Sequence, residues 1–136
     1  MTMEIKEYFK NYTDFVDSVT AEVSKNDAAF TERFKQLSVQ LGGNYSRLDN
    51  AIAGLAGESG EVADLWKKVK YHGLEYDAQT REKFQKELGD VCWYLFQTAY
   101  ALNMPMNEII DANVAKLKQR HSHGFSAEYM QQKKGD

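Results

Sequence analysis

The spacing of the apolar residues limits, more than any other feature, what this chain can fold into. Apolar side chains recur every three or four positions, as they do on one face of an α-helix, and alternating β-branched runs are absent. Pro105 is the single proline in 136 residues, so little in the sequence breaks a helix. The pattern predicts an all-α protein.

Turn residues divide the chain into about five expected helices that form an antiparallel bundle. The expected ranges are 5–23, 30–41, 46–71, 77–102 and 106–120. Ser46 and Asp77 are suited to cap the third and fourth helices, because their side-chain oxygens can accept hydrogen bonds from backbone N–H groups. The loop between these two helices is short, so they should lie antiparallel. No repeat or linker divides the chain, and we expect one domain over residues 1–136.

Charge and cysteine content exclude several functional classes. The formal net charge is −3, and nothing indicates the basic surface of a nucleic-acid-binding protein. The single cysteine, Cys92, lies in an apolar run, so we expect a buried, unreactive thiol in a reducing compartment. Neither a signal-peptide core nor a run of about 20 apolar residues is present. A cytoplasmic protein that binds neither nucleic acid nor a membrane is therefore expected.

Two pairs of carboxylates with i, i+3 spacing are the main functional signal. Glu58 and Glu61 share a face of the third expected helix, and Glu87 and Asp90 share a face of the fourth. Antiparallel packing would bring all four together, where they repel one another unless a cation lies among them. Oxygen ligands favour hard ions, so the pattern predicts a site for Mg²⁺ or Mn²⁺ that serves phosphate chemistry.

Three glycines accompany the first carboxylate pair. Gly54, Gly57 and Gly60 lie in the same expected helix, and each lowers helix stability by up to about 1 kcal/mol relative to alanine. Close approach of another helix or of a ligand would explain them, as would tight helix packing alone. Under either explanation the helix tolerates this cost next to the acids.

Three segments together resemble the signature of the MazG-like nucleoside triphosphate pyrophosphohydrolases. They are residues 54–68 (GLAGESGEVADLWKK), residues 87–95 (ELGDVCWYL), and residues 113–120 (NVAKLKQR) followed by Gly124-Phe125. The resemblance covers residues 48–125, and residues 1–45 match only in being helical. The chain has His121-Ser122 where family members often have Tyr-Pro, which would alter access to the site without affecting metal binding.

The resemblance implies a MazG-like all-α fold that assembles as a homodimer or as a dimer of dimers, a homotetramer. It also implies Mg²⁺-dependent conversion of a nucleoside triphosphate, (d)NTP, to the monophosphate and pyrophosphate. Deoxynucleotides would be preferred, and the role would be to clean or rebalance the dNTP pool. Carried over by position, the metal ligands would be Glu58, Glu61, Glu87 and Asp90.

The expected substrate contacts are other residues, and the same resemblance implies three of them. Asn113, Lys116 and Arg120 would contact the triphosphate, and their spacing puts them on one face of the fifth expected helix. Lys68 would either reach a phosphate or lie on a solvated face. Tyr94, one turn beyond the second acid pair, would line the nucleoside pocket or pack in the core.

The charges also indicate a mechanism. A metal-bound water would be the nucleophile, and one carboxylate would orient or deprotonate it. Glu61, Glu58 and the neighbouring Asp64 are the candidates for this catalytic role, and the sequence does not separate them.

Three alternatives stay open at this point. A phosphoribosyl-ATP pyrophosphatase or a dUTPase-like member of the same superfamily would share the metal site and differ in the base pocket. A di-iron bundle is disfavoured, because neither acid motif contains the histidine that such sites use. A non-enzymatic helical adaptor would use the acids for solubility alone, and it would tolerate neutralisation of Glu61 or Asp90.

Overall fold

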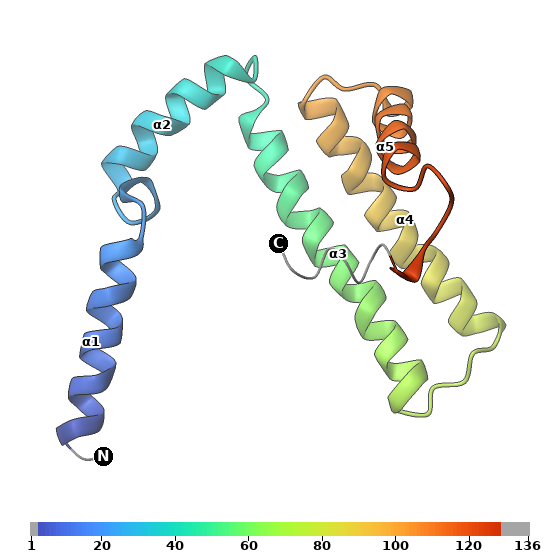
Figure 1. Ribbon diagram of the computed structural model, residues 1–136, viewed down its shortest axis with the longest axis horizontal. Coiled ribbons are helices and arrows are strands. Elements are labelled where there is room, and N and C mark those ends of the chain that lie inside the picture. Colours follow the sequence, from blue (N-terminus) through green and yellow to red (C-terminus); the bar gives the residue numbers. More distant parts are fainter. Residues whose placement is uncertain (1–2, 129–136) are drawn as a thin grey trace. The chain divides into compact units, whose positions relative to one another are not determined.

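The computed structural model describes residues 3–128, with side chains from residue 5, and every regular element in this range is a helix. The elements are α1 (Met3–Val19), a short 3₁₀ helix η1 (Glu22–Ser24), α2 (Asp27–Gln40), α3 (Tyr45–Tyr71), α4 (Ala78–Ala101) and α5 (Met106–Arg120) (Figure 1). The prediction of an all-α chain with five α-helices is confirmed. Within the described range, no helix combines the length and the apolar character needed to cross a membrane.

The chain divides into two units at the start of α3. The first unit is residues 1–45, with α1, η1 and α2, and the second is residues 46–136, with α4, α5 and nearly all of α3. The second unit therefore contains the whole region of the predicted family resemblance. The expectation of one domain over residues 1–136 stays a prediction.

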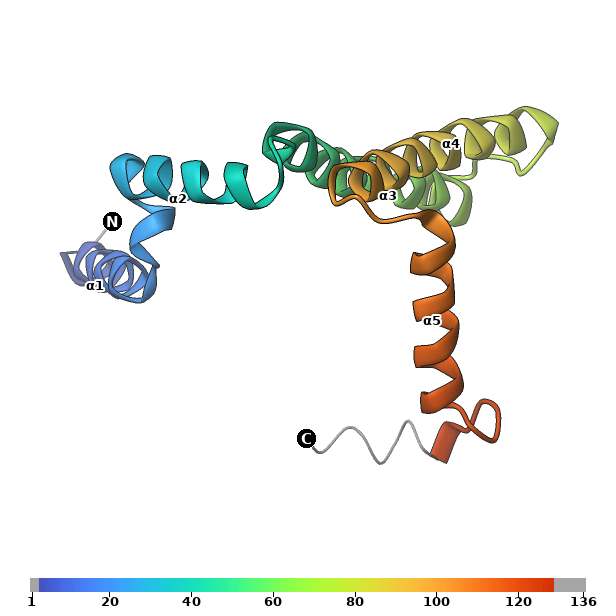
Figure 2. The same ribbon diagram turned by 90° about the horizontal axis from the view of Figure 1, so that it is seen from above.

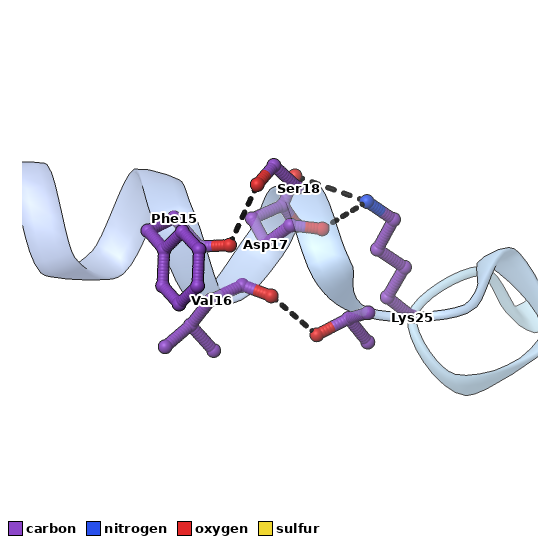
Figure 3. Close-up of polar contacts among 6 residues, drawn as sticks. Phe15, Val16, Asp17, Ser18 and Lys25 are labelled. Atoms are coloured by element: carbon purple, nitrogen blue, oxygen red, sulfur yellow. Dashed lines mark hydrogen bonds and ion pairs between the residues drawn. The ribbon is translucent and has the colours of Figure 1, made fainter.

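In the first unit, α1 ends one turn before its apolar pattern predicted. The pattern extends to Val23, but the helix ends at Val19 and a 3₁₀ turn follows. At this end the Ser18 hydroxyl donates to the Phe15 carbonyl oxygen at 2.7 Å (Figure 3). Lys25 follows η1, and its ammonium donates to two oxygens of Asp17, near the end of α1. These are the carbonyl oxygen (2.8 Å) and a carboxylate oxygen (3.0 Å) (Figure 3). These side chains satisfy carbonyl groups that a helix end leaves unpaired, so the helix can stop there.

In the second unit, α3 and α4 form the antiparallel pair that positions the site. The turn between them contains Gly73 at φ 72°, a left-handed conformation that favours glycine. Asp77 then begins α4 by accepting a hydrogen bond from the Thr80 N–H at 2.8 Å, as predicted. The two helices lie side by side in both views (Figures 1 and 2). Ser46 does not cap α3, because the helix already begins at Tyr45.

Of the three glycines in α3, only Gly54 has the close neighbour that the sequence predicted. A Cβ on Gly54 would overlap the ring carbons of Tyr94, which comes from α4. A Cβ on Gly57 or Gly60 would meet nothing within 4 Å among the described residues. Gly54 thus allows α3 to accept a tyrosine ring against its backbone, and the other two glycines face open space in the single chain.

Alanine substitutions at two of these glycines should have opposite effects on stability. Gly54→Ala should lower the free energy of unfolding by about 1–3 kcal/mol, because the Tyr94 ring must move to admit a methyl group. Gly57→Ala should raise it by about 0.5–1 kcal/mol, because a helix-interior glycine is replaced where there is room. Urea unfolding of both variants measures the difference. A Gly54→Ala protein that is more stable than the wild type would contradict this packing.

α5 leaves the end of α4 and points away from the α3–α4 pair. Its start follows Pro105, as predicted, and Figure 2 shows the helix extending away from the other two along its length. Three apolar residues at helical spacing on α5, Ile110, Val114 and Leu117, are exposed. Among residues 46–128 the antiparallel arrangement is therefore limited to α3 and α4, and α5 does not extend the expected bundle.

Few large side chains are buried in the described chain. The buried apolar residues are Ala51, Leu65, Ala99 and Ala101. Trp93 is 62% exposed, and Cys92 beside it is also exposed. The prediction of a buried thiol is therefore wrong for the single chain, because no other described segment covers this face of α4.

Candidate metal centre

Three of the four predicted metal ligands meet between α3 and α4. Glu58 on α3 and Glu87 and Asp90 on α4 each offer a carboxylate oxygen, and these oxygens lie within 4.8 Å of one another. Glu58 and Glu87 are half-buried, whereas Asp90 is exposed. We call these three residues the acid cluster. It follows from the antiparallel pairing, which places the middle of one helix against the middle of the other (Figure 1).

The carboxylates of the acid cluster repel one another. Partial burial raises the pKa of Glu58 above its ordinary value, and the negative charges of Asp90, Glu87 and Glu61 raise it further. Glu61, the fourth predicted ligand, is exposed on the turn after Glu58 and acts on it through charge, although it lies outside the group of three. A bound divalent cation would relieve this repulsion, as would a proton.

Asp64 and Lys68 form an ion pair one turn further along α3. The Lys68 ammonium lies 2.6 Å from an Asp64 carboxylate oxygen, and the Lys67 ammonium lies 2.9 Å from the other oxygen. The hydrogen bonds from Lys68 and then from Lys67 lower the pKa of Asp64 to about 2. The pKa of Lys68 is raised by Asp64 first, and Glu61 and Glu87 add to the shift. Lys68 therefore carries its charge at the edge of the acid cluster, and Asp64 is a weak proton acceptor.

Tyr94 lies one turn beyond Asp90 and closes one side of a polar pocket. It is half-buried because its ring packs on Gly54. The pocket has a volume of about 420 Å³ and is lined by Ser46, Arg47, Asn50, Trp93, Tyr94 and Gln97.

Sequence reasoning did not single out Arg47, Asn50 or Gln97. The signal that could have found Gln97 is its spacing, since it follows Asp90 by seven residues and so lies on the same helix face.

The predicted triphosphate contacts lie on α5, apart from the acid cluster. Asn113, Lys116 and Arg120 are exposed on this helix, and Figure 2 shows its length extending away from α3 and α4. Asn113 and Lys116 border a separate pocket of about 540 Å³ between α5 and the residues that precede it. The structure thus brings together Glu58, Glu87 and Asp90 within one chain, and it does not bring the α5 residues to them.

The described chain is thus an all-α protein, and its antiparallel helices α3 and α4 bring three carboxylates together in a candidate metal centre. The MazG nucleotide pyrophosphohydrolase domain matches residues 47–125. This match covers more than half of the chain, and the chain belongs to that family. It is similar to the Gene 37 protein of Mycobacterium phage L5, with 36% identity over 78 residues, which are 57% of this chain and 68% of that protein. No solved structure matches the chain.

The family match confirms the resemblance read from the three sequence segments. It includes the acid cluster and the whole of α5, and it begins one residue after the second unit begins. A nucleotide pyrophosphohydrolase domain indicates a hydrolase that acts on nucleotides. The N-terminal helices α1 and α2 lie outside the match.

Proposed function

We propose that this protein is a Mg²⁺-dependent pyrophosphohydrolase that converts a nucleoside triphosphate to its monophosphate and pyrophosphate. Deoxynucleotides would be the preferred substrates, and the role of the enzyme would be to clean or rebalance the dNTP pool. The observation that carries the proposal is the convergence of Glu58, Glu87 and Asp90 in a chain of the MazG family.

The donor set of the acid cluster suits a hard cation. Three carboxylates within 4.8 Å of one another supply only oxygen ligands, which Mg²⁺ and Mn²⁺ prefer. Burial raises the pKa of Glu58, and the charges of the neighbouring acids raise it further; such an ion would balance these charges. Glu61, whose charge contributes to that shift, would be the fourth ligand. When bound, the ion would neutralise charge on the triphosphate and lower the pKa of a coordinated water.

The side chains in and around the cluster would accept the proton of the water, orient the water and bind a phosphate. Asp64 would be the poorest proton acceptor of the three candidates, because the hydrogen bonds from Lys68 and Lys67 hold its pKa at about 2, which leaves Glu58 and Glu61 for this role. Glu61 would orient the water from the adjacent turn. Lys68, held in place by Asp64, would bind a phosphate oxygen at the edge of the cluster. The reaction breaks the bond between the α-phosphorus and its bridging oxygen, and the water oxygen replaces it.

We also propose that a second copy of the chain completes the site. In one chain, α5 extends away from the α3–α4 pair that carries the acid cluster (Figure 2), although all three helices fall largely within the family match. The apolar residues of α5 are exposed, and so is the face of α4 that carries Cys92 and Trp93. Exposed apolar surfaces of this kind are typical of surfaces that another subunit covers. A homodimer or homotetramer would place Asn113, Lys116 and Arg120 of one copy over the acids of the other.

A substrate panel tests the proposed function. Purified protein with Mg²⁺ should release equal amounts of monophosphate and pyrophosphate from at least one nucleoside triphosphate, and EDTA should abolish the reaction. Release of inorganic phosphate in place of pyrophosphate would contradict the proposed bond cleavage. Turnover of phosphoribosyl-ATP alone, or of dUTP alone, would assign the chain to one of the alternative activities. No turnover of any nucleotide would favour the adaptor.

A further inference from the structure

The polar pocket beside Tyr94 lies where a nucleoside would lie if its phosphates occupied the acid cluster. Asp90, Tyr94 and Gln97 occupy successive turns on one face of α4. Seven residues of helix span about 10 Å, so Gln97 stands about that far from the cluster along the helix. This is the space that a sugar and a base require beyond the α-phosphate. The pocket combines two aromatic rings with amide and guanidinium groups, which suits a flat polar ring such as a nucleobase.

The orientation of the Gln97 amide is fixed by Arg47. The Arg47 guanidinium donates to the Gln97 Oε1 at 2.5 Å, and it also lies over the Tyr100 ring at 4.6 Å from the centroid. Arginine only donates hydrogen bonds, so the oxygen of the Gln97 amide must face it. The amide NH₂ of Gln97 is therefore turned away from Arg47, and it can donate only to another group.

We propose that Gln97, held by Arg47, selects the nucleobase and favours bases with a keto oxygen over bases with an amino group at the equivalent position. An NH₂ donor pairs with the O4 of thymine or uracil or the O6 of guanine, and it opposes the N4 or N6 amino group of cytosine or adenine. The positive charge of Arg47 beside it strengthens the same preference. This inference rests on the proposed function, since it assumes that the phosphates lie at the acid cluster.

Gln97→Glu tests the selection, because it preserves the bond to Arg47 and replaces the donor with an acceptor. The measurement is the ratio of kcat/KM for dTTP and dGTP to that for dCTP and dATP. We expect this ratio to fall by about ten- to a hundredfold in Gln97→Glu, and Gln97→Ala to bring it close to one. Gln79→Glu, near the other end of α4 and outside the pocket, is the matched control and should leave the ratio unchanged.

The outcomes separate this inference from the proposed function. Hydrolysis by the wild type with an unchanged base ratio in Gln97→Glu would overturn the role of Gln97 and leave the activity standing. If the wild type hydrolyses no nucleotide, the proposed function fails. Binding of dTMP and dCMP then decides the base preference alone; it is followed by tryptophan fluorescence in a Trp66→Phe protein, where Trp93 in the pocket is the remaining tryptophan. Equal affinities for the two, in both wild type and variant, would overturn it.

Discussion

Glu87→Gln is expected to lower nucleoside triphosphate hydrolysis by at least about 100-fold while the protein remains folded. The carboxylate of Glu87 lies within 4.8 Å of those of Glu58 and Asp90, so its loss would remove one of the proposed metal ligands from the acid cluster. The charge of Glu87 also helps to raise the pKa of Glu58, so its removal relieves repulsion. The unfolding midpoint without metal should therefore stay the same or rise. Addition of Mg²⁺ should raise the midpoint of the wild type and have little effect on the variant.

Glu82→Gln is the matched control for this experiment. Glu82 lies on the same helix, is exposed, and pairs with Lys86 at 2.8 Å, away from the acid cluster. An exposed pair of this kind contributes little to stability, so the control should keep activity within about twofold of the wild type. Full activity in Glu87→Gln would rule out the acid cluster as the metal centre and would leave the adaptor interpretation in place.

The local features of the fold could be predicted because short stretches of sequence determine them. Asp77 caps α4 and Pro105 precedes α5, and both roles depend on neighbouring residues alone. The end of α1 was missed because it depends on Lys25, which reaches back across a turn to Asp17. Such a contact has no periodic signature in the sequence.

The acid cluster could be predicted in the same way, whereas its surroundings could not. The i, i+3 spacing and a short loop are enough to bring Glu58 to Glu87 and Asp90. The same register between α3 and α4 also joins Arg47 to Gln97, 50 residues apart, but neither residue belongs to a motif, so nothing in the sequence marked this bond. The exposure of Cys92 could not be predicted for another reason. An apolar helix face has the same sequence pattern whether or not another segment of the chain covers it.

Mixing two inactive variants should restore activity if one site draws on two chains. Glu87→Gln removes a proposed metal ligand from the acid cluster, and the double variant Lys116→Ala/Arg120→Ala removes two cations from α5. Each alone should lose at least about 100-fold in activity, because phosphoryl transfer needs both the metal and the cations that hold the phosphates. Lys118→Ala, on the opposite face of the same helix, is the control and should remain active.

The expected recovery follows from the symmetry of a dimer. In a mixed dimer, one site combines both defects and is inactive, while the other combines the intact acid cluster of one chain with the intact α5 of its partner. Random pairing of equal amounts makes half of the dimers mixed, so the mixture should regain about a quarter of wild-type activity. Recovery at this level would require α5 of one chain to act on the acids of its partner. Within one chain, α5 extends away from the α3–α4 pair (Figure 2). If native mass spectrometry detects mixed dimers and activity does not return, each site must lie within a single chain.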